Sequence, residues 1–265
     1  MSQELICEVA EGIARMKINR PEARNAMTGA VIQEMLAFCR RIENDPEVRC
    51  LLITGAGEHF MAGGDVKTFM QVIDQSAEEL RANFEQRSLD AAPLWAILER
   101  MPKPVVCSVR GFCAGAALSF VAGSDLTIVS DNAKFLLAHV GLGLSPDAAT
   151  TYHLPRTVGV KLAKQLAFFG DRFDAAEALR IGLVNWVVPD AELDAKTEEI
   201  LKRLAAAPSV SIAQSKRLMN QALGRTISEQ VADEGIGVGN CAVSEDLKEG
   251  VRAFVEKRKP QFRGR

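Results

Sequence analysis

The chain has 265 residues, of which 48% are hydrophobic and 25% are charged, and its formal net charge is −2. These values are typical of a globular protein with one large domain, and they exclude the basic surface that binds nucleic acid or an anionic membrane. No stretch approaches the ~18 consecutive apolar residues of a membrane span, and residues 1–7 lack a signal-peptide pattern. The six cysteines lack metal-ligand spacing, so we expect reduced thiols in a cytoplasmic protein that binds no metal.

Predicted strands and helices alternate along the chain up to about residue 190. Short apolar, β-branched runs predict strands at residues 5–9, 13–18, 48–54, 105–109, 126–129, 135–137 and 184–188. Apolar residues at helical spacing predict helices at 30–43, at 77–100 with an interruption at Pro93, and from Pro146 to residue 153. From residue 190 the pattern is almost entirely helical, with breaks near Pro208 and Gly224. The sequence therefore predicts an α/β core followed by a helical segment.

Two loops of small residues follow two of the predicted strands. The first runs from His59 to Asp65 (HFMAGGD) and the second from Gly111 to Ala117 (GFCAGAA). Small residues at a strand-to-helix turn let a ligand approach the backbone and leave N–H groups free at the helix start. Two such turns side by side would direct two N–H donors at one oxygen, as in sites that stabilise an enolate or a tetrahedral oxyanion. The alternative is that the glycines only form tight turns.

Five segments of the chain resemble the crotonase superfamily, the enoyl-CoA hydratase/isomerase group. They lie, in the family's order, at residues 19–27 (NRPEARNAM), 55–67 (GAGEHFMAGGDVK), 103–125, 133–159 and 249–262. The resemblance implies an α/β, ClpP-like spiral of ββα units over residues 1–195 and a C-terminal helical trimerisation region over residues 196–265. It also implies an acyl-CoA thioester as substrate and a homotrimer, or a hexamer made of two trimers.

The resemblance assigns roles to residues of both loops. The backbone N–H groups of Gly64 and Ala116 would form an oxyanion hole for the thioester carbonyl. The CoA moiety would lie along Ala23, Arg24, Ala26, Ala62, Asp65 and Lys67, with Phe254 and Lys257 completing its site, sometimes from a neighbouring subunit. Coenzyme A enters as part of the substrate, so we expect no separate cofactor.

The sequence departs from the family's hydratases at two positions. Those enzymes use two acidic side chains, and the matching positions here hold Ser119 and His139, which become candidate acyl-pocket residues. One acid, Asp147, remains nearby, and its segment SPDAATTYHLPR resembles the enoyl-CoA isomerases of the phenylacetate-degradation type. The resemblance therefore favours an acyl-CoA isomerase in which Asp147 alone moves a proton during a double-bond shift or a ring-epoxide rearrangement. The alternative role for Asp147 is to bind free N–H groups at a helix start.

Three other functions remain open. The chain could be an enoyl-CoA hydratase-like lyase, or a hydrolase or dehalogenase in which Asp147 attacks the acyl or aryl carbon as a nucleophile. It could also bind acyl-CoA without catalysis. The acyl group itself depends on residues 68–100, in which the sequence contains no motif that identifies it.

Overall fold

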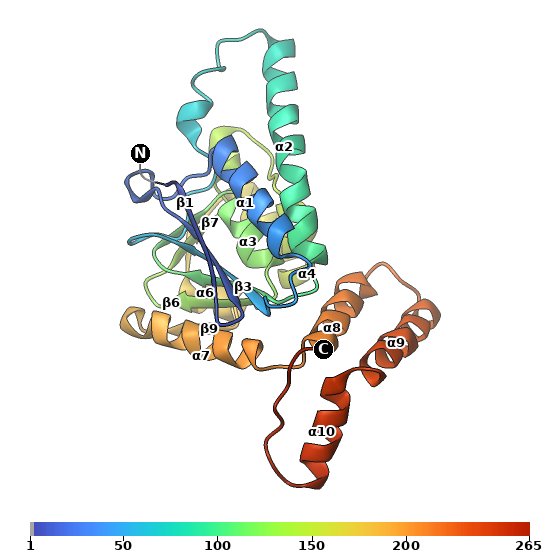
Figure 1. Cartoon of the computed structure of the whole chain (residues 1–265). Coiled ribbons are helices and arrows are strands. Elements are labelled where there is room, and N and C mark those ends of the chain that lie inside the picture. Colours follow the sequence, from blue (N-terminus) through green and yellow to red (C-terminus); the bar gives the residue numbers. More distant parts are fainter. Residues whose placement is uncertain (1–2) are drawn as a thin grey trace.

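The main sheet has six strands, with an antiparallel hairpin at one edge (Figure 1). Figure 1 shows the computed structural model, which describes residues 3–265. In sheet order the strands are β1 (Leu5–Ala10), β2 (Ile13–Ile18), β3 (Cys50–Gly55), β4 (Val105–Val109), β6 (Leu126–Ser130) and β9 (Trp186–Val188). From β2 onward all neighbours are parallel. The predicted hairpin is confirmed, and Glu11 and Gly12 at its turn have φ values of 52° and 77°, which suit a two-residue hairpin loop.

A second sheet of three short strands lies beside the first. It contains β5 (Phe112–Ala114), β7 (Lys134–Leu136) and β8 (Phe173–Asp174). The chain passes from the main sheet to this one between β4 and β5, and Gly111 at that corner has a φ of 58°. A Cβ on Gly111 would lie 2.1 Å from the carbonyl oxygen of Glu58, so only glycine fits. The analysis of the sequence missed β5 and β8 because runs of three and two residues carry no periodic pattern.

Helices cover both faces of the main sheet. The α-helices of the described residues are α1 (Gly29–Ile42), α2 (Ala77–Arg100), α3 (Ala117–Gly123), α4 (Thr150–Val158), α5 (Val160–Phe169), α6 (Ala175–Arg180), α7 (Leu193–Ala205), α8 (Ser209–Ala222), α9 (Ile227–Ala242) and α10 (Glu245–Val255), of which α8 to α10 lie away from the sheet. Short 3₁₀ helices occur at η1 (Pro21–Ala23), η2 (Val66–Thr68), η3 (Ala138–Leu142) and η4 (Asp190–Glu192). None of the helices within residues 3–265 is both long and apolar enough to cross a membrane.

Two predicted helix boundaries were wrong. Pro93 does not interrupt α2, which continues through it. The carbonyl that loses its donor there belongs to Leu89, which is exposed and can bind water instead. The helix predicted from Pro146 begins only at Thr150, because Ala148 and Ala149 adopt left-handed conformations with φ of 55° and 59°. The predicted helix at 30–43 and the breaks near residues 208 and 224 are confirmed.

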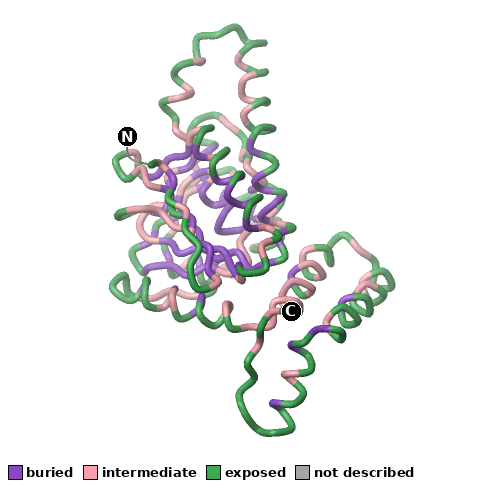
Figure 2. Tube along the Cα trace, viewed as in Figure 1, coloured by how far each residue is buried: buried purple, intermediate pink, exposed green. Residues whose placement is uncertain are grey.

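Alternating side chains of the strands build two cores, one on each face of the sheet. On one face Ile13, Leu52, Val106 and Ile128 pack against α7. On the other face the larger core lies beneath α1, α2, α3 and α4 (Figure 1). Helix α8 contacts the end of α2, and α8 to α10 extend away from the core and are mostly exposed (Figure 1 and Figure 2), so the C-terminal region buries few side chains within one chain.

Candidate active site

The two small-residue loops meet where β3 and β4 end, as the sequence predicted. Met61 donates its N–H to the carbonyl of Phe112, and Ala114 donates its N–H to the carbonyl of Met61, both at 3.0 Å. A Cβ on Gly63 would lie 2.8 Å from the carbonyl oxygen of Ala114 and 3.3 Å from the nitrogen of Ala116. This close approach, together with a φ of 88°, requires glycine at position 63.

Two backbone donors remain free at this junction. Within residues 3–265, the N–H groups of Gly64 and Ala116 have no backbone acceptor. Their neighbours are fixed, because Asp65 donates to the carbonyl of Met27 at 2.9 Å and Gly115 donates to the carbonyl of Leu136 at 2.9 Å. Ala116 is also the N-cap residue of α3, where unpaired N–H groups are expected. The arrangement suits an oxyanion hole, and that role for the two amides stays a prediction.

Asp147 lies before α4 and contacts two other elements. Its Oδ1 is 3.2 Å from His139 Nε2 in η3, and its Oδ2 accepts a hydrogen bond of 3.3 Å from Ser88 Oγ in α2. The Asp147 side chain is 51% exposed, whereas that of His139 is 10% exposed. The alternative role as a helix cap is not observed, because α4 has Ala149 at its N-cap and no side-chain cap. The carboxylate therefore faces outward with one oxygen held by a buried imidazole.

The two candidate pocket residues both touch the segment that carries Asp147. Ser119, in α3 and 1% exposed, donates its hydroxyl to the carbonyl of Ala148. His139 contacts Asp147 directly, and its other ring nitrogen, Nδ1, is buried without a partner among the described residues. The structure thus brings Ser119, His139 and Asp147 together. Ser88 joins this cluster, and no sequence pattern pointed to it because it is one polar residue among many on the long helix α2.

The residues expected along CoA fall into two groups. The expected CoA-binding residues between positions 23 and 67 lie together. Ala62 donates its N–H to the carbonyl of Arg24 at 3.0 Å, and η1 and η2 flank this contact. The Asp65 carboxylate is already engaged, with Oδ2 at 3.0 Å from Arg20 Nη2 and Oδ1 accepting from the N–H of Lys67 at 3.1 Å. The Asp65 backbone is engaged as well, because its N–H donates to the carbonyl of Met27 and its carbonyl accepts from Thr68, so Asp65 has a structural function in the loop. Ala23 and Ala26 lie in and just after η1, on the same segment as Arg24.

The second group, Phe254 and Lys257, lies elsewhere. Both are at the end of α10, which is at the opposite end of the molecule from α1 and α2 (Figure 1). Phe254 is 85% exposed. Within one chain these residues do not join the Arg24 segment, so any contribution to its CoA site requires another subunit.

An arginine that the sequence analysis did not single out also lies near the expected CoA segment. The guanidinium carbon of Arg172 is 5.9 Å from the ring centroid of Phe112, and that of Arg24 is 5.5 Å from the same ring. Both guanidinium groups are exposed on the surface. Arg172 lies 148 positions from Arg24 in the sequence, so no local pattern links them.

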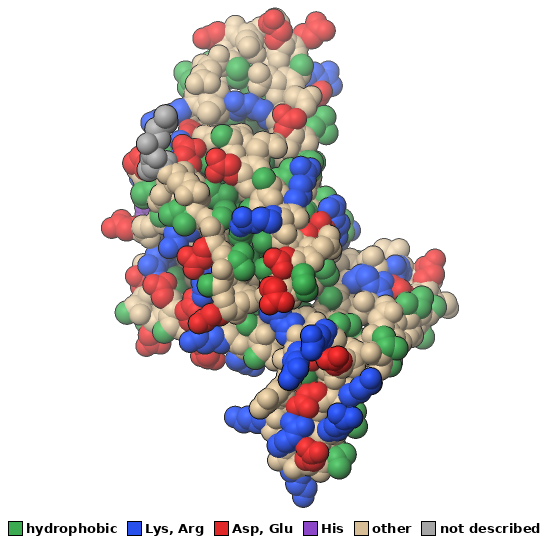
Figure 3. Space-filling model, in the orientation of Figure 1, with side chains coloured by type: hydrophobic (Ala, Val, Ile, Leu, Met, Phe, Trp, Pro, Cys, Tyr) green, Lys and Arg blue, Asp and Glu red, His purple; other side chains and the backbone are tan. Residues whose placement is uncertain are grey.

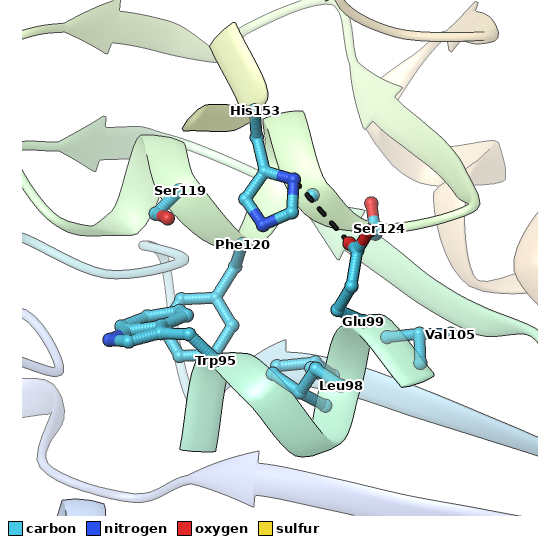
Figure 4. A pocket seen from close by; sticks show the side chains of 10 residues that line it. Trp95, Leu98, Glu99, Val105, Ser119, Phe120, Ser124 and His153 are labelled. Carbon is cyan, nitrogen blue, oxygen red and sulfur yellow. Dashed lines mark ion pairs between the residues drawn. The ribbon is translucent and has the colours of Figure 1, made fainter. Parts of the chain in front are cut away.

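A small cavity lies between α2, α3 and α4 (Figure 4) and is lined by an acid and a base that are both partly buried. Its volume is about 10 Å³, and Trp95 and Phe120 form one wall with ring centroids 4.5 Å apart. His153 Nδ1 lies 3.7 Å from Glu99 Oε2. Burial raises the pKa of the Glu99 carboxyl and lowers the pKa of the His153 imidazole. This cavity is too small for an acyl chain, and Glu99 and His153 also line a larger cavity of about 500 Å³ between α4 and α8.

Comparison with known proteins decides the family. Residues 8–265 match the model of the family described as enoyl-CoA hydratase/isomerase. The chain belongs to this family. It is 35% identical over 261 residues to a crotonyl-CoA hydratase of Syntrophomonas wolfei, covering 98% of both chains. It is 33% identical over 265 residues to the 1,2-epoxyphenylacetyl-CoA isomerase of Escherichia coli, covering 100% of both.

Solved structures of the family confirm the fold. The crystal structure of an enoyl-CoA hydratase from Polaromonas sp. JS666 matches with a TM-score of 0.90 at 28% identity, covering 97% of this chain and 99% of that one. The predicted crotonase-type α/β fold is therefore correct, and the chain is an enzyme of the hydratase/isomerase family. Relatives carry both hydratase and isomerase names, so membership of the family alone does not choose the reaction.

Proposed function

We propose that this enzyme is an acyl-CoA isomerase that shifts a double bond, or rearranges a ring epoxide, on a CoA thioester. The main support is the side-chain set around Asp147. The positions that match the hydratase acids hold Ser119 and His139, and both contact the Asp147 segment. A single carboxylate suffices for a 1,3-proton shift, whereas adding water uses two acids in the family's hydratases.

The proposed shift begins with Asp147 as a carboxylate. It removes a proton from the α-carbon of a 3-enoyl thioester, the C–H electron pair enters the conjugated system, and negative charge collects on the thioester oxygen. The N–H groups of Gly64 and Ala116 stabilise that oxygen. The neutral Asp147 carboxyl then returns its proton to the γ-carbon, which gives the conjugated 2-enoyl thioester and restores the carboxylate.

Hydration is the second candidate, because relatives such as the Syntrophomonas wolfei enzyme are named as hydratases. Asp147 and His139 would then have to place the water and manage its protons between them. Their contact of 3.2 Å makes such cooperation geometrically feasible.

One assay separates these reactions. The enzyme is given 3-hexenoyl-CoA in deuterated water, and the absorbance of the conjugated thioester is followed while mass spectrometry and NMR locate the deuterium. We expect the conjugated product, with deuterium at the γ-carbon in the fraction of turnovers in which the half-exposed Asp147 carboxyl exchanges its proton with solvent before returning it, and much slower hydration of crotonyl-CoA. Rapid hydration without isomerisation would favour the hydratase, and a covalent adduct on Asp147 would favour a nucleophilic role. Binding without turnover of either this thioester or an epoxyphenylacetyl thioester would favour a non-catalytic binder.

We also propose that the enzyme assembles as a homotrimer or as a pair of trimers through its C-terminal helices. Helices α8 to α10 expose many large apolar side chains, among them Met219, Leu223, Ile227, Ile236, Val238, Val243, Phe254 and Val255. A cavity of about 500 Å³ also opens between α4 and α8. By contrast, basic and acidic side chains are interspersed over the face shown in Figure 3, so that face offers no continuous basic surface for nucleic acid. The exposed apolar side chains of α8 to α10 form a patch of the kind that is typical of protein interfaces.

The solution mass checks the assembly. Light scattering coupled to size-exclusion chromatography should give three or six times the chain mass of 28.8 kDa. A trimer would let Phe254 and Lys257 reach the CoA segment of another subunit. A stable monomer would contradict the proposed assembly and would leave these two residues without a role in CoA binding.

A further inference from the structure

We propose that Ser119 and His139 are positioning residues that hold Asp147 in the orientation needed for proton transfer. The inference deepens the proposed isomerase function and rests on it. Its basis is that two buried polar side chains, from α3 and η3, each make their contact to the short segment Asp147–Ala148. At the two positions where hydratases of this family carry acids, this chain has Ser119 and His139, and these two side chains position the remaining acid, Asp147.

His139 acts on the carboxylate itself. For a neutral imidazole, only the tautomer with its proton on Nε2 can donate to Asp147 Oδ1 across the 3.2 Å contact. A doubly protonated ring would present the same Nε2–H to Oδ1, so Nε2 is the donor in either case. Oδ1 is held by the buried His139, whereas Oδ2 accepts only the long, exposed hydrogen bond from Ser88, so Oδ2 is the oxygen that takes and returns the substrate proton.

Ser119 acts on the backbone beside the carboxylate. Its hydroxyl donates to the carbonyl of Ala148, the first of two consecutive alanines with left-handed φ values of 55° and 59°. This conformation is unfavourable for any residue with a Cβ, so the segment needs contacts that hold it. Ser119 lies three residues after Ala116 in α3, and its hydrogen bond therefore ties the position of Asp147 to the helix that starts at the proposed oxyanion hole.

Exposure explains why Asp147 needs such support. Its side chain is half exposed, and its contact with Ser88 is long, at 3.3 Å, and also exposed. An aspartate held only by that contact would sample several rotamers in water. Misplacing a catalytic group by about 1 Å can cost about 10²-fold in rate. The buried contacts of His139 and Ser119 restrict the Asp147 side chain and its backbone more tightly than the contact with Ser88 does.

Three substitutions at His139 test the donor. The amide nitrogen of glutamine reaches roughly the position of Nε2, whereas that of asparagine reaches roughly the position of Nδ1. We expect His139→Leu and His139→Asn to lower kcat by up to about 10²-fold with little change in KM, and His139→Gln to restore most of the loss. The control for lost stability is His153→Gln, at a histidine that pairs with Glu99 and makes no hydrogen bond or ion pair with Asp147. If His139→Gln is as impaired as His139→Leu, His139 does more than donate a hydrogen bond and the inference is overturned.

A double-mutant cycle tests whether Ser119 acts through Asp147. Ser119→Ala should lower kcat in the native enzyme and should have no further effect in an Asp147→Asn background, because positioning matters only while the carboxylate is present. An equal loss in both backgrounds would show a general structural role and would overturn the inference for Ser119.

A spectroscopic measurement tests the contact between His139 and Asp147 independently of the proposed isomerase reaction. The chain has three histidines, so the ¹⁵N signals of His139 can be assigned from single substitutions. We expect a protonated Nε2, with a shifted Nε2 signal in Asp147→Leu. A bare Nε2, or no response to Asp147→Leu, would overturn the inference. The expected signals in an enzyme that isomerises no thioester would instead support the contact and refute the proposed reaction.

Discussion

Replacing Asp147 with asparagine is expected to lower kcat for isomerisation by about 10²–10⁴-fold, the usual contribution of a general acid–base group. Asparagine has nearly the same shape and keeps an oxygen for the His139 contact, but it cannot accept a proton from carbon at neutral pH. The measurement is steady-state turnover of 3-hexenoyl-CoA, combined with the rate of α-deuterium exchange. Both rates should fall together, since both require the same proton removal.

The matched control for this change is Asp131→Asn. Asp131 is an exposed aspartate directly after β6, and its backbone N–H, which the change preserves, donates to Val188. Both variants should unfold at nearly the native temperature, because Asp147 is half exposed and contributes little buried contact. Native turnover in Asp147→Asn would refute Asp147 as the proton carrier.

Ala116→Pro is expected to lower kcat by about 10²–10³-fold, which is the usual cost of losing one oxyanion-hole donor. The change deletes the N–H, and the φ of Ala116, −59°, already suits proline. No backbone hydrogen bond within residues 3–265 depends on that N–H. Gly115 precedes the new proline with a φ of 57°, and glycine tolerates such restriction better than other residues.

Ala116→Ser is the matched control, because it changes the side chain and keeps the backbone donor. Circular dichroism and thermal unfolding should show that both variants fold. Turnover should fall steeply in the proline variant and only slightly in the serine variant. Equal turnover in the two variants would show that the amide of residue 116 does not stabilise the transition state.

The places where sequence reasoning failed share a physical cause. The helix predicted from Pro146 is absent before Thr150, since the left-handed Ala148 and Ala149 are imposed by contacts such as that with Ser119 and not by local propensity. Likewise α2 passes through Pro93, because packing of the rest of the helix against the core outweighs one missing hydrogen bond. In both cases a distant contact overrides a local preference.

The sequence alone determined the order of the longer strands and helices, the two small-residue loops, the family and the presence of a single acid at position 147. These features are readable because hydrophobic periodicity and the conformational demands of glycine act over a few residues. Only the tertiary structure decided which side chains meet Asp147, since Ser88 lies 59 positions away and Ser119 lies 29 positions from Ala148. Such contacts depend on how α2, α3 and η3 pack on the sheet, and packing of elements far apart in the chain leaves no periodic trace in the sequence.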